Sequence, residues 1–284
     1  MPFTPLKHTI AKYRWLYQLG LQGPDMFFYN IPILRHRDYR NVGSYMHEHK
    51  VNAFFECCLR RIGTIRSRQQ QEEAISYLAG FMNHYIADSI CHPYVYGRIG
   101  YPVDAPTSMH HGMHAHLENE LDAILLWKYK KKKPSEFNQT ATICLNGQEI
   151  QFISHFLASC INETYYPITY RNNFQVTPAM VHRSIWALRF GCRTLSDKNG
   201  KKKFGIAQVE SIFVNHPVAS AKMVTRVSTA SFVDLFHETL DKCSRVYALL
   251  NSAVTDNMPL DKQDLSPLLT ELGNESYHSG LPVD

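Results

Sequence analysis

Apolar residues recur every three or four positions through most of the chain, the spacing that lines one face of an α-helix. This pattern predicts helices over residues 5–19, 47–66, 70–92, 111–130, 150–166, 177–192, 231–250 and 266–272. No strand-rich region competes with them, although Asn146-Gly147 in the polar stretch 134–149 is a turn signal that suits a short hairpin. We therefore predict an all-α fold, a multi-helix bundle.

Local signals mark several of the expected helix ends. Pro93 is expected to end the third helix, because proline cannot donate the backbone hydrogen bond that a helix interior requires. Thr177 followed by Pro178 is typical of a helix start. Loops are expected at residues 97–109 and 196–203.

The composition bounds the architecture and narrows the possible partners. The chain has 284 residues, 44% of them hydrophobic, which is enough for a sizeable core. We predict a single domain over residues 1–284, with a half that carries the candidate functional residues at about 1–130 and a helical completion at about 135–284. The net charge of +5 permits contact with anionic substrates or a membrane surface without requiring it. Seven cysteines without a CxxC pair argue against a disulfide framework.

The start of the chain carries no targeting signal that we can identify. It lacks the basic region and long apolar stretch of a secretory signal. No window approaches the roughly 20 apolar residues of a membrane span. We therefore expect a cytoplasmic protein without a transmembrane segment, leave peripheral membrane contact open, and find nothing that specifies the oligomeric state.

A row of polar side chains on the third expected helix is the most informative feature of the chain. His84, Asp88 and His92 are four residues apart and lie one above another on a face that also carries Tyr77 and Phe81. A carboxylate on such an apolar face needs a partner or a metal ion. A single pair of this kind is more often an ordinary helix pair or a core histidine than a ligand set.

A second row of the same kind lies on the next expected helix, at His114, Glu118 and Asp122. Two inward-facing rows supply at least five nitrogen and oxygen donors. Imidazole and carboxylate groups are ligands that zinc takes, and this number of donors suits a site with more than one zinc ion.

Three upstream residues could complete such a site. Asp25 follows a Gly-Pro turn, His47 is expected to open the second helix, and His8 lies on the first. Each is also ordinary at its position, because Gly-Pro-Asp is a common turn and a helix N-terminus tolerates histidine.

Taken in order, these residues resemble the zinc-dependent phospholipase C family, and most closely its bacterial branch without a secretion signal. The resemblance covers about residues 1–130 and rests on the string 77–94 and on His8, Gly23-Pro24-Asp25, His47, His84-x3-Asp88, His92 and His114-x3-Glu118. It implies an all-helical bundle of the zinc phospholipase C and P1 nuclease type, with a zinc cluster at the floor of a cleft.

The resemblance also implies which residues hold the metal. One zinc ion would take Asp25, His47, His84 and Asp88, and a second would take His92, His114 and Glu118. In the secreted members a third zinc ion is shared by the counterparts of Asp88 and His8 and by an N-terminal tryptophan that processing exposes. This chain begins Met1-Pro2, so we expect two zinc ions and leave a third, with His8, open.

Two details depart from a simple transfer of the family pattern. The gap before His92 is shorter than in the secreted members, but it keeps His92 on the face of the preceding carboxylate. His49 is a rival to His47 as a ligand, and His116 is a weaker rival to His114.

These observations predict a zinc-dependent phosphodiesterase that hydrolyses a phosphoester or phospholipid through a zinc-bound hydroxide. Asp25 would serve as a ligand and as a candidate proton acceptor. One alternative is a single-strand nuclease or other phosphoesterase on the same fold, although the sequence places no aromatic stacking platform and the modest charge predicts no stable nucleic-acid partner. The other is a zinc-stabilised helical protein without turnover. The substrate headgroup cannot be derived from the sequence.

Overall fold

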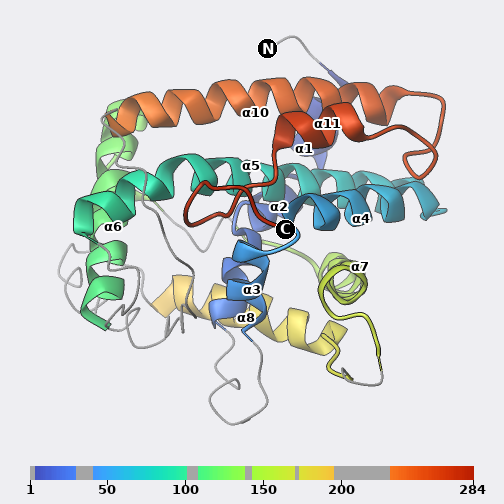
Figure 1. Ribbon diagram of the computed structural model, residues 1–284, viewed down its shortest axis with the longest axis horizontal. Helices are drawn as coiled ribbons and strands as arrows, with labels where there is room; N and C mark the ends of the chain where they lie inside the picture. The colour runs from blue at the N-terminus through green and yellow to red at the C-terminus, as the bar shows by residue number, and fades with distance from the viewer. Residues whose placement is uncertain (1–3, 30–40, 101–107, 138–142, 170–172, 195–230) are drawn as a thin grey trace.

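The computed structural model of the protein describes residues 4–29, 41–100, 108–137, 143–169, 173–194 and 231–284 (Figure 1). Within these ranges the regular elements are helices and no strand forms, which confirms the all-α prediction. The α-helices are α1 (Pro5–Lys12), α2 (Arg14–Gly20), α3 (Val42–Glu48), α4 (Val51–Thr64), α5 (Arg68–Ile99), α6 (Ser108–Lys130), α7 (Gly147–Tyr165), α8 (Pro178–Thr194), α10 (Phe232–Thr255) and α11 (Ser266–Leu272). Two 3-10 helices are described as well, η1 (Gly23–Tyr29) and η3 (Pro134–Glu136).

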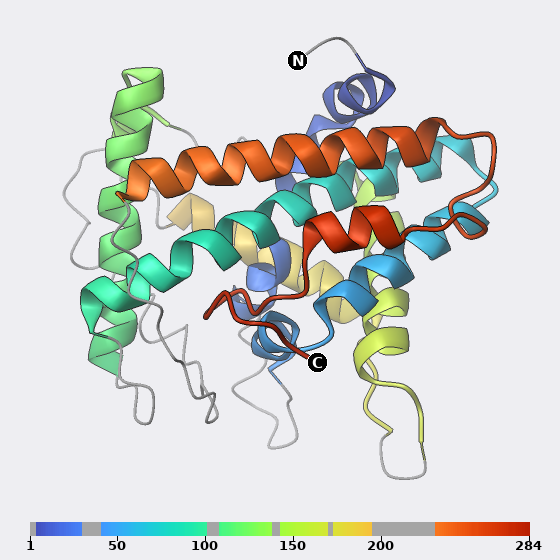
Figure 2. The same ribbon diagram turned by 45° about the horizontal axis from the view of Figure 1, so that its top comes forward.

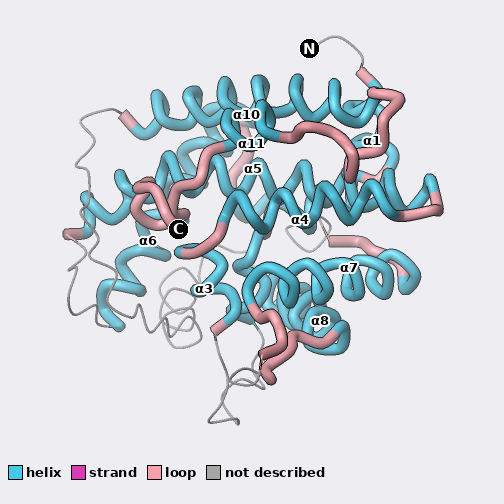
Figure 3. Tube along the Cα trace, turned by 45° about the vertical axis from the view of Figure 1, so that its right-hand side comes forward, coloured by secondary structure: helices cyan, strands magenta, loops and turns pink. Residues whose placement is uncertain are grey.

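The long helix α5 is the central element of the molecule. Helices α1, α2, α4, α6, α7 and α10 all pack against it. Figures 1 and 2 show α10 running along α5, while α6 stands across the ends of both helices. After α11 the chain continues as a loop that runs back toward α3, where it ends (Figure 3). No helix of the described residues is long and apolar enough to cross a lipid bilayer.

The prediction that Pro93 ends the third helix is wrong. Helix α5 continues to Ile99 and is capped by Gly100, whose φ is 60°. Proline removes the hydrogen bond to the carbonyl of Ser89 and crowds that carbonyl with its ring, and packing on both sides of the helix outweighs these costs. The extension matters for the site, because it places Tyr96 one turn beyond the row of polar side chains.

Two other expected helices are each divided in the structure. The first breaks at Tyr13, between α1 and α2. The second becomes α3 and α4, separated at Lys50, whose φ of 50° is left-handed and whose N–H donates to the carbonyl of Asp284. His47 therefore lies in the last turn of α3 and does not open a helix.

The predicted loops and hairpin fall largely outside the described residues. This applies to residues 101–107, to 138–142 and to the whole of 196–203. The described part of the stretch 134–149 contains η3 and the start of α7, and no hairpin strand forms there. Asn146, read as a turn residue, caps α7 through its side chain and the backbone N–H of Glu149.

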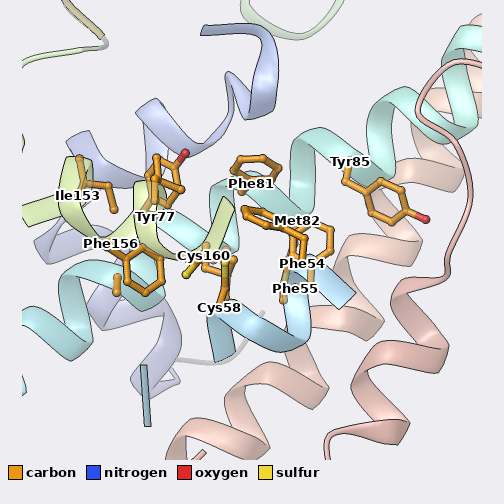
Figure 4. Close-up of a cluster of buried hydrophobic side chains, with 14 of the residues drawn as sticks. Phe54, Phe55, Cys58, Tyr77, Phe81, Met82, Tyr85, Ile153, Phe156 and Cys160 are labelled. Carbon is orange, nitrogen blue, oxygen red and sulfur yellow. The ribbon is translucent and has the colours of Figure 1, made fainter. Parts of the chain in front are cut away.

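One cluster of the core lies between α4, α5 and α7 (Figure 4). Phe54 and Phe55 of α4 pack their rings against Phe81 of α5, with centroids 5.3 and 5.8 Å apart. Tyr77 and Phe81 are fully buried, as the pattern on this helix predicts. This packing anchors α5 immediately before the first polar side chain of its row. No disulfide joins the seven cysteines.

Candidate metal centre

Three polar side chains from three different elements converge beside α5. Asp25 comes from η1, His47 from α3 and His84 from α5, and their ligand atoms lie within 4.8 Å of one another. The Nε2 atom of His47 is 3.1 Å from Oδ1 of Asp25. The His47 and His84 side chains are 2% and 9% exposed, whereas Asp25 is 40% exposed. We call these three residues the first donor group.

A direct backbone contact between α2 and α5 positions this group. A Cβ atom on Gly20 would lie 2.1 Å from the carbonyl oxygen of Tyr77, and one on Gly80 would lie 2.1 Å from the carbonyl oxygen of Tyr17. Only glycine permits so close an approach. The crossing therefore holds η1, which follows α2, beside the turn of α5 that carries His84.

A second close approach fixes η1 itself. Gly23 has a φ of 48°, and a Cβ atom there would lie 2.0 Å from Cδ2 of His84. The backbone of η1 can lie against the His84 ring only with glycine at this position. The Gly-Pro-Asp sequence, predicted as a turn, thus brings Asp25 to the same ring.

The second donor group consists of His92 from α5 and His114 and Glu118 from α6. Oε1 of Glu118 lies 3.1 Å from Nε2 of His92 and 2.9 Å from Nε2 of His114. The Glu118 side chain is 43% exposed, and those of His92 and His114 are 10% and 17% exposed. The shorter gap before His92 keeps it on the inner face, as predicted.

Asp88 lies between the two groups. Its Oδ2 atom is 3.2 Å from Nε2 of His84 and 4.0 Å from Nε2 of His47 in the first group. The same oxygen is 3.8 Å from Nδ1 of His92 in the second. One carboxylate therefore connects both groups.

Backbone carbonyls fix the orientation of three of the histidines. The Nδ1 atom lies 2.7 Å from the carbonyl of Gly43 in His47 and 3.1 Å from that of Leu21 in His84. In His92 it lies 2.8 Å from the carbonyl oxygen of Tyr277. A carbonyl only accepts, so Nδ1 carries the proton and Nε2 faces the centre. Metal-binding histidines are commonly held in this way.

The remaining nitrogen atoms then face carboxylate oxygens. A neutral Nε2 and a carboxylate oxygen are both acceptors, so spacings of 3.1–3.2 Å between them require a proton or a cation between the two atoms. The buried Nε2 of His84 and Oδ2 of Asp88 make no well-aligned hydrogen bond. The donor set therefore fits zinc, which takes imidazole nitrogen and carboxylate oxygen.

The charges of the cluster favour protonated imidazoles when no metal is bound. Burial alone would lower the pKa of His84, but the charges of Asp88 and Asp25 raise it to about 9. Burial also opposes protonation of His92, yet Asp88 and the hydrogen bond to Glu118 raise its pKa to about 10. Burial would raise the pKa of Asp88, and the neighbouring histidines His84 and His92 hold it below its ordinary value. Proton and metal would thus compete for the same nitrogen atoms.

The structure leaves some of the candidate residues outside both groups. His8 is exposed on α1 and joins neither group. Of the two rivals, His49 packs against Tyr45 with tilted rings whose centroids are 4.4 Å apart, and His116 is exposed. The expected inward row on the fourth helix ends at Glu118, because the Asp122 residue is exposed.

Sequence reasoning missed the contribution of the C-terminal residues. Tyr277 and His278 are 2% and 6% exposed, and both lie against histidines of the two donor groups. No local pattern marks them, since 185 residues separate Tyr277 from His92. The only available signal was a histidine near the end of the chain without an assigned role.

The fold and the centre define an all-helical protein with two adjoining groups of histidine and carboxylate side chains that could hold metal ions. The zinc dependent phospholipase C family model matches residues 1–169, and the chain belongs to this family. The match confirms the resemblance, includes every residue of both donor groups, and extends beyond the expected 130 residues through α7. No curated protein and no solved structure matches the chain.

Proposed function

We propose that this protein is a zinc-dependent phosphodiesterase of the phospholipase C type. The observation that carries the proposal is the convergence of Nε2 atoms and carboxylate oxygens at spacings that need a cation or a proton between them. It gains weight from the family to which the chain belongs, a family of zinc-dependent hydrolases.

Two zinc ions would be held, one by each donor group. The first would take Asp25, His47, His84 and Asp88, and the second would take His92, His114 and Glu118. When bound, zinc supplies Lewis-acid chemistry: it neutralises charge on phosphoryl oxygens and acidifies water. Whether His8 takes part in a third site stays a separate question, because it lies outside both groups.

The exposure of the carboxylates favours a catalytic centre over a purely structural one. Structural zinc sites are closed, whereas catalytic sites keep a position open to water or substrate. Asp25 and Glu118 are 40% and 43% exposed, while the His47 side chain behind them is 2% exposed. A phosphoester could therefore approach from the carboxylate side while the histidines stay fixed.

Asp25 is the residue we assign to proton transfer. It is the most exposed donor of the first group, so water can reach it. Its carboxylate would accept the proton of the attacking water at an oxygen atom that is not engaged by the metal. The phosphate of a lipid headgroup and that of another phosphodiester present the same chemistry to this centre.

The test combines metal content with hydrolysis. Purified protein is measured by plasma mass spectrometry and assayed with a chromogenic phosphocholine ester, with and without chelator. We expect about two zinc ions per chain and hydrolysis that chelator removes and added zinc restores. An Asp25→Asn variant loses a charged ligand of the first group together with the candidate proton acceptor, so it should lose most of its turnover and bind the first zinc ion more weakly.

Each other outcome contradicts the proposal, and two of them favour a stated alternative. Zinc without hydrolysis of the ester, of phospholipid vesicles or of single-stranded nucleic acid favours a zinc-stabilised protein without turnover. Hydrolysis of nucleic acid alone favours the nuclease alternative. If the protein contains no zinc after dialysis against a zinc solution, the assignment of the metal centre is contradicted.

A further inference from the structure

The last eleven residues of the chain, 274–284, form a closed loop that we call the C-terminal loop. The N–H of Ser276 donates to the carbonyl of Leu281 at 2.8 Å, and the N–H of Val283 donates to that of Asn274 at 2.9 Å. Asp284 at the end accepts a hydrogen bond from the N–H of Lys50, between α3 and α4. These bonds fix both ends of the loop (Figure 3).

The loop is also fixed to α5 on both sides of its tip. The N–H of Glu275 donates to the hydroxyl oxygen of Tyr85 at 2.9 Å. The same hydroxyl donates to the Glu275 carboxylate at 2.5 Å. Gly280 has a φ of 62°, and a Cβ atom there would lie 2.6 Å from the carbonyl oxygen of Ser89, the residue after Asp88. The tip of the loop is therefore held over the polar row of α5.

Tyr277, at this tip, contacts both donor groups through its backbone. Its N–H donates to the carbonyl of His47 at 3.0 Å, and its own carbonyl accepts from Nδ1 of His92 at 2.8 Å. Its ring also lies on those of His47 and His84, with centroids 4.8 and 5.9 Å apart. The loop thus sets which nitrogen of His92 faces Glu118.

His278 lies between the rings of one histidine from each group. Its ring stacks on His47 with a centroid distance of 4.8 Å and an angle of 13°, and on His92 at 5.9 Å and 22°. Its Nδ1 atom pairs with the hydroxyl of Tyr96 at 2.9 Å. His278 is 6% exposed, so it fills the space between His47 and His92.

We propose that the C-terminal loop completes the metal centre, with Tyr277 and His278 as positioning residues that hold His47 and His92 in their ligating orientation. The proposal rests on the proposed function only as far as metal binding, and hydrolysis is not required for it. Both residues lie outside residues 1–169, the part of the chain that the family model matches. The distant C-terminus therefore supplies a wall of a site whose ligands all come from the first half.

The experiment measures zinc affinity in full-length variants by competition with a chromogenic chelator. Loss of partners that orient ligating histidines commonly costs about 10–100-fold in metal affinity, and we expect His278→Ala to weaken zinc binding within this range. His278→Phe retains a flat ring between His47 and His92 but loses the pairing with Tyr96, so its zinc affinity should fall only severalfold. His182→Ala, which removes an exposed histidine on α8, is the matched control and should bind zinc as the wild type does.

Two further readouts separate positioning from general stability. The visible spectrum of the Co²⁺-loaded protein should change in His278→Ala, since the ligand orientation changes, while the unfolding midpoint of the metal-free variant reports stability alone. If His278→Ala does not fold, Tyr96→Phe decides, because it removes only the hydroxyl that pairs with His278 and should weaken zinc binding severalfold. A lowered unfolding midpoint with unchanged zinc affinity and Co²⁺ spectrum would overturn the proposal. A wild type that binds zinc without hydrolysis would contradict the proposed function and leave this inference intact.

Discussion

The two donor groups use the same kinds of atoms but are held in different ways. The first is assembled from η1, α3 and α5, and both of its histidines donate Nδ1–H to a backbone carbonyl. The second spans the neighbouring helices α5 and α6, and among the described residues a backbone carbonyl pairs with His92 of this group but not with His114. We infer that the first group is preorganised by the fold, whereas the second can adjust to an incoming ligand, since preorganised donors lose less freedom on binding.

The two groups differ in the contacts that set their geometry. The first depends on glycine contacts, between the backbones of α2 and α5 where they cross and between Gly23 and the ring of His84. The second depends on one turn of α6, whose His114 and Glu118 are four residues apart and face each other at 2.9 Å. Zinc should therefore bind the first group more tightly than the second.

The largest expected effect comes from the residue that connects the groups. Asp88→Asn removes the negative charge that lies 3.2 Å from His84 and 3.8 Å from His92. We therefore expect weaker binding of both zinc ions, with a loss of zinc affinity of about 100-fold or more in the first group. Metal content after dialysis and titration with a chelator check this. Retention of full metal content would show that the two groups do not share this carboxylate.

The next largest effect is on the zinc content of one donor group alone. His84→Ala deletes a donor of the first group only, and we expect it to lose one equivalent of zinc and keep the other. His116→Ala, an exposed histidine on α6, is the control and should retain both equivalents. Plasma mass spectrometry of the two variants distinguishes the outcomes, and loss of both equivalents in His84→Ala would mean that the groups bind as one unit.

A smaller effect tests the preorganisation of the first group without changing a ligand. In Gly23→Ala the new methyl group would collide with the His84 ring, and we expect at least about a tenfold loss of zinc affinity in that group. Gly97→Ala is the matched control, because a Cβ atom at Gly97 meets nothing within 4 Å. Equal affinities in the two variants would argue against the role of the η1 backbone.

The smallest expected effect is the release of protons when zinc binds. His84 and His92 have pKa values of about 9 and 10 in the metal-free protein, so both are protonated at pH 7.5 and zinc must displace about two protons. Isothermal titration in buffers of different ionisation enthalpy measures this release. A binding enthalpy that does not change with the buffer would contradict it.

The same raised pKa values predict opposite stability trends for the two forms. Charged histidines with raised folded-state pKa values stabilise the metal-free protein fully below pH 6.5, and this contribution is lost as the pH rises through about 9 and 10. Zinc binding strengthens over the same range, because fewer protons compete for Nε2. The thermal unfolding midpoints of the metal-free and the zinc-loaded protein should therefore move apart as the pH rises from 7 to 10.

Much of the centre could be predicted from local spacing. The i, i+4 rows on α5 and α6 bring His84 to Asp88 and His114 to Glu118, because the helical repeat alone places such residues on one face. The all-α class follows from the same periodicity. The predicted end at Pro93 was wrong, because a single lost backbone hydrogen bond weighs less than the packing around it.

Spacing along the chain cannot specify which separate elements meet, since this depends on packing between residues far apart in sequence. His47 and not His49 joins the first donor group, because α3 ends at Glu48 between them, and His8 is exposed on α1 outside both groups. The contacts of Tyr277 with His92 join residues 185 positions apart. Helical periodicity and residue types therefore predict the all-α class and the candidate ligands, whereas the packing of the chain specifies which of these side chains face one another, because only the packed chain holds separate helices in one geometry.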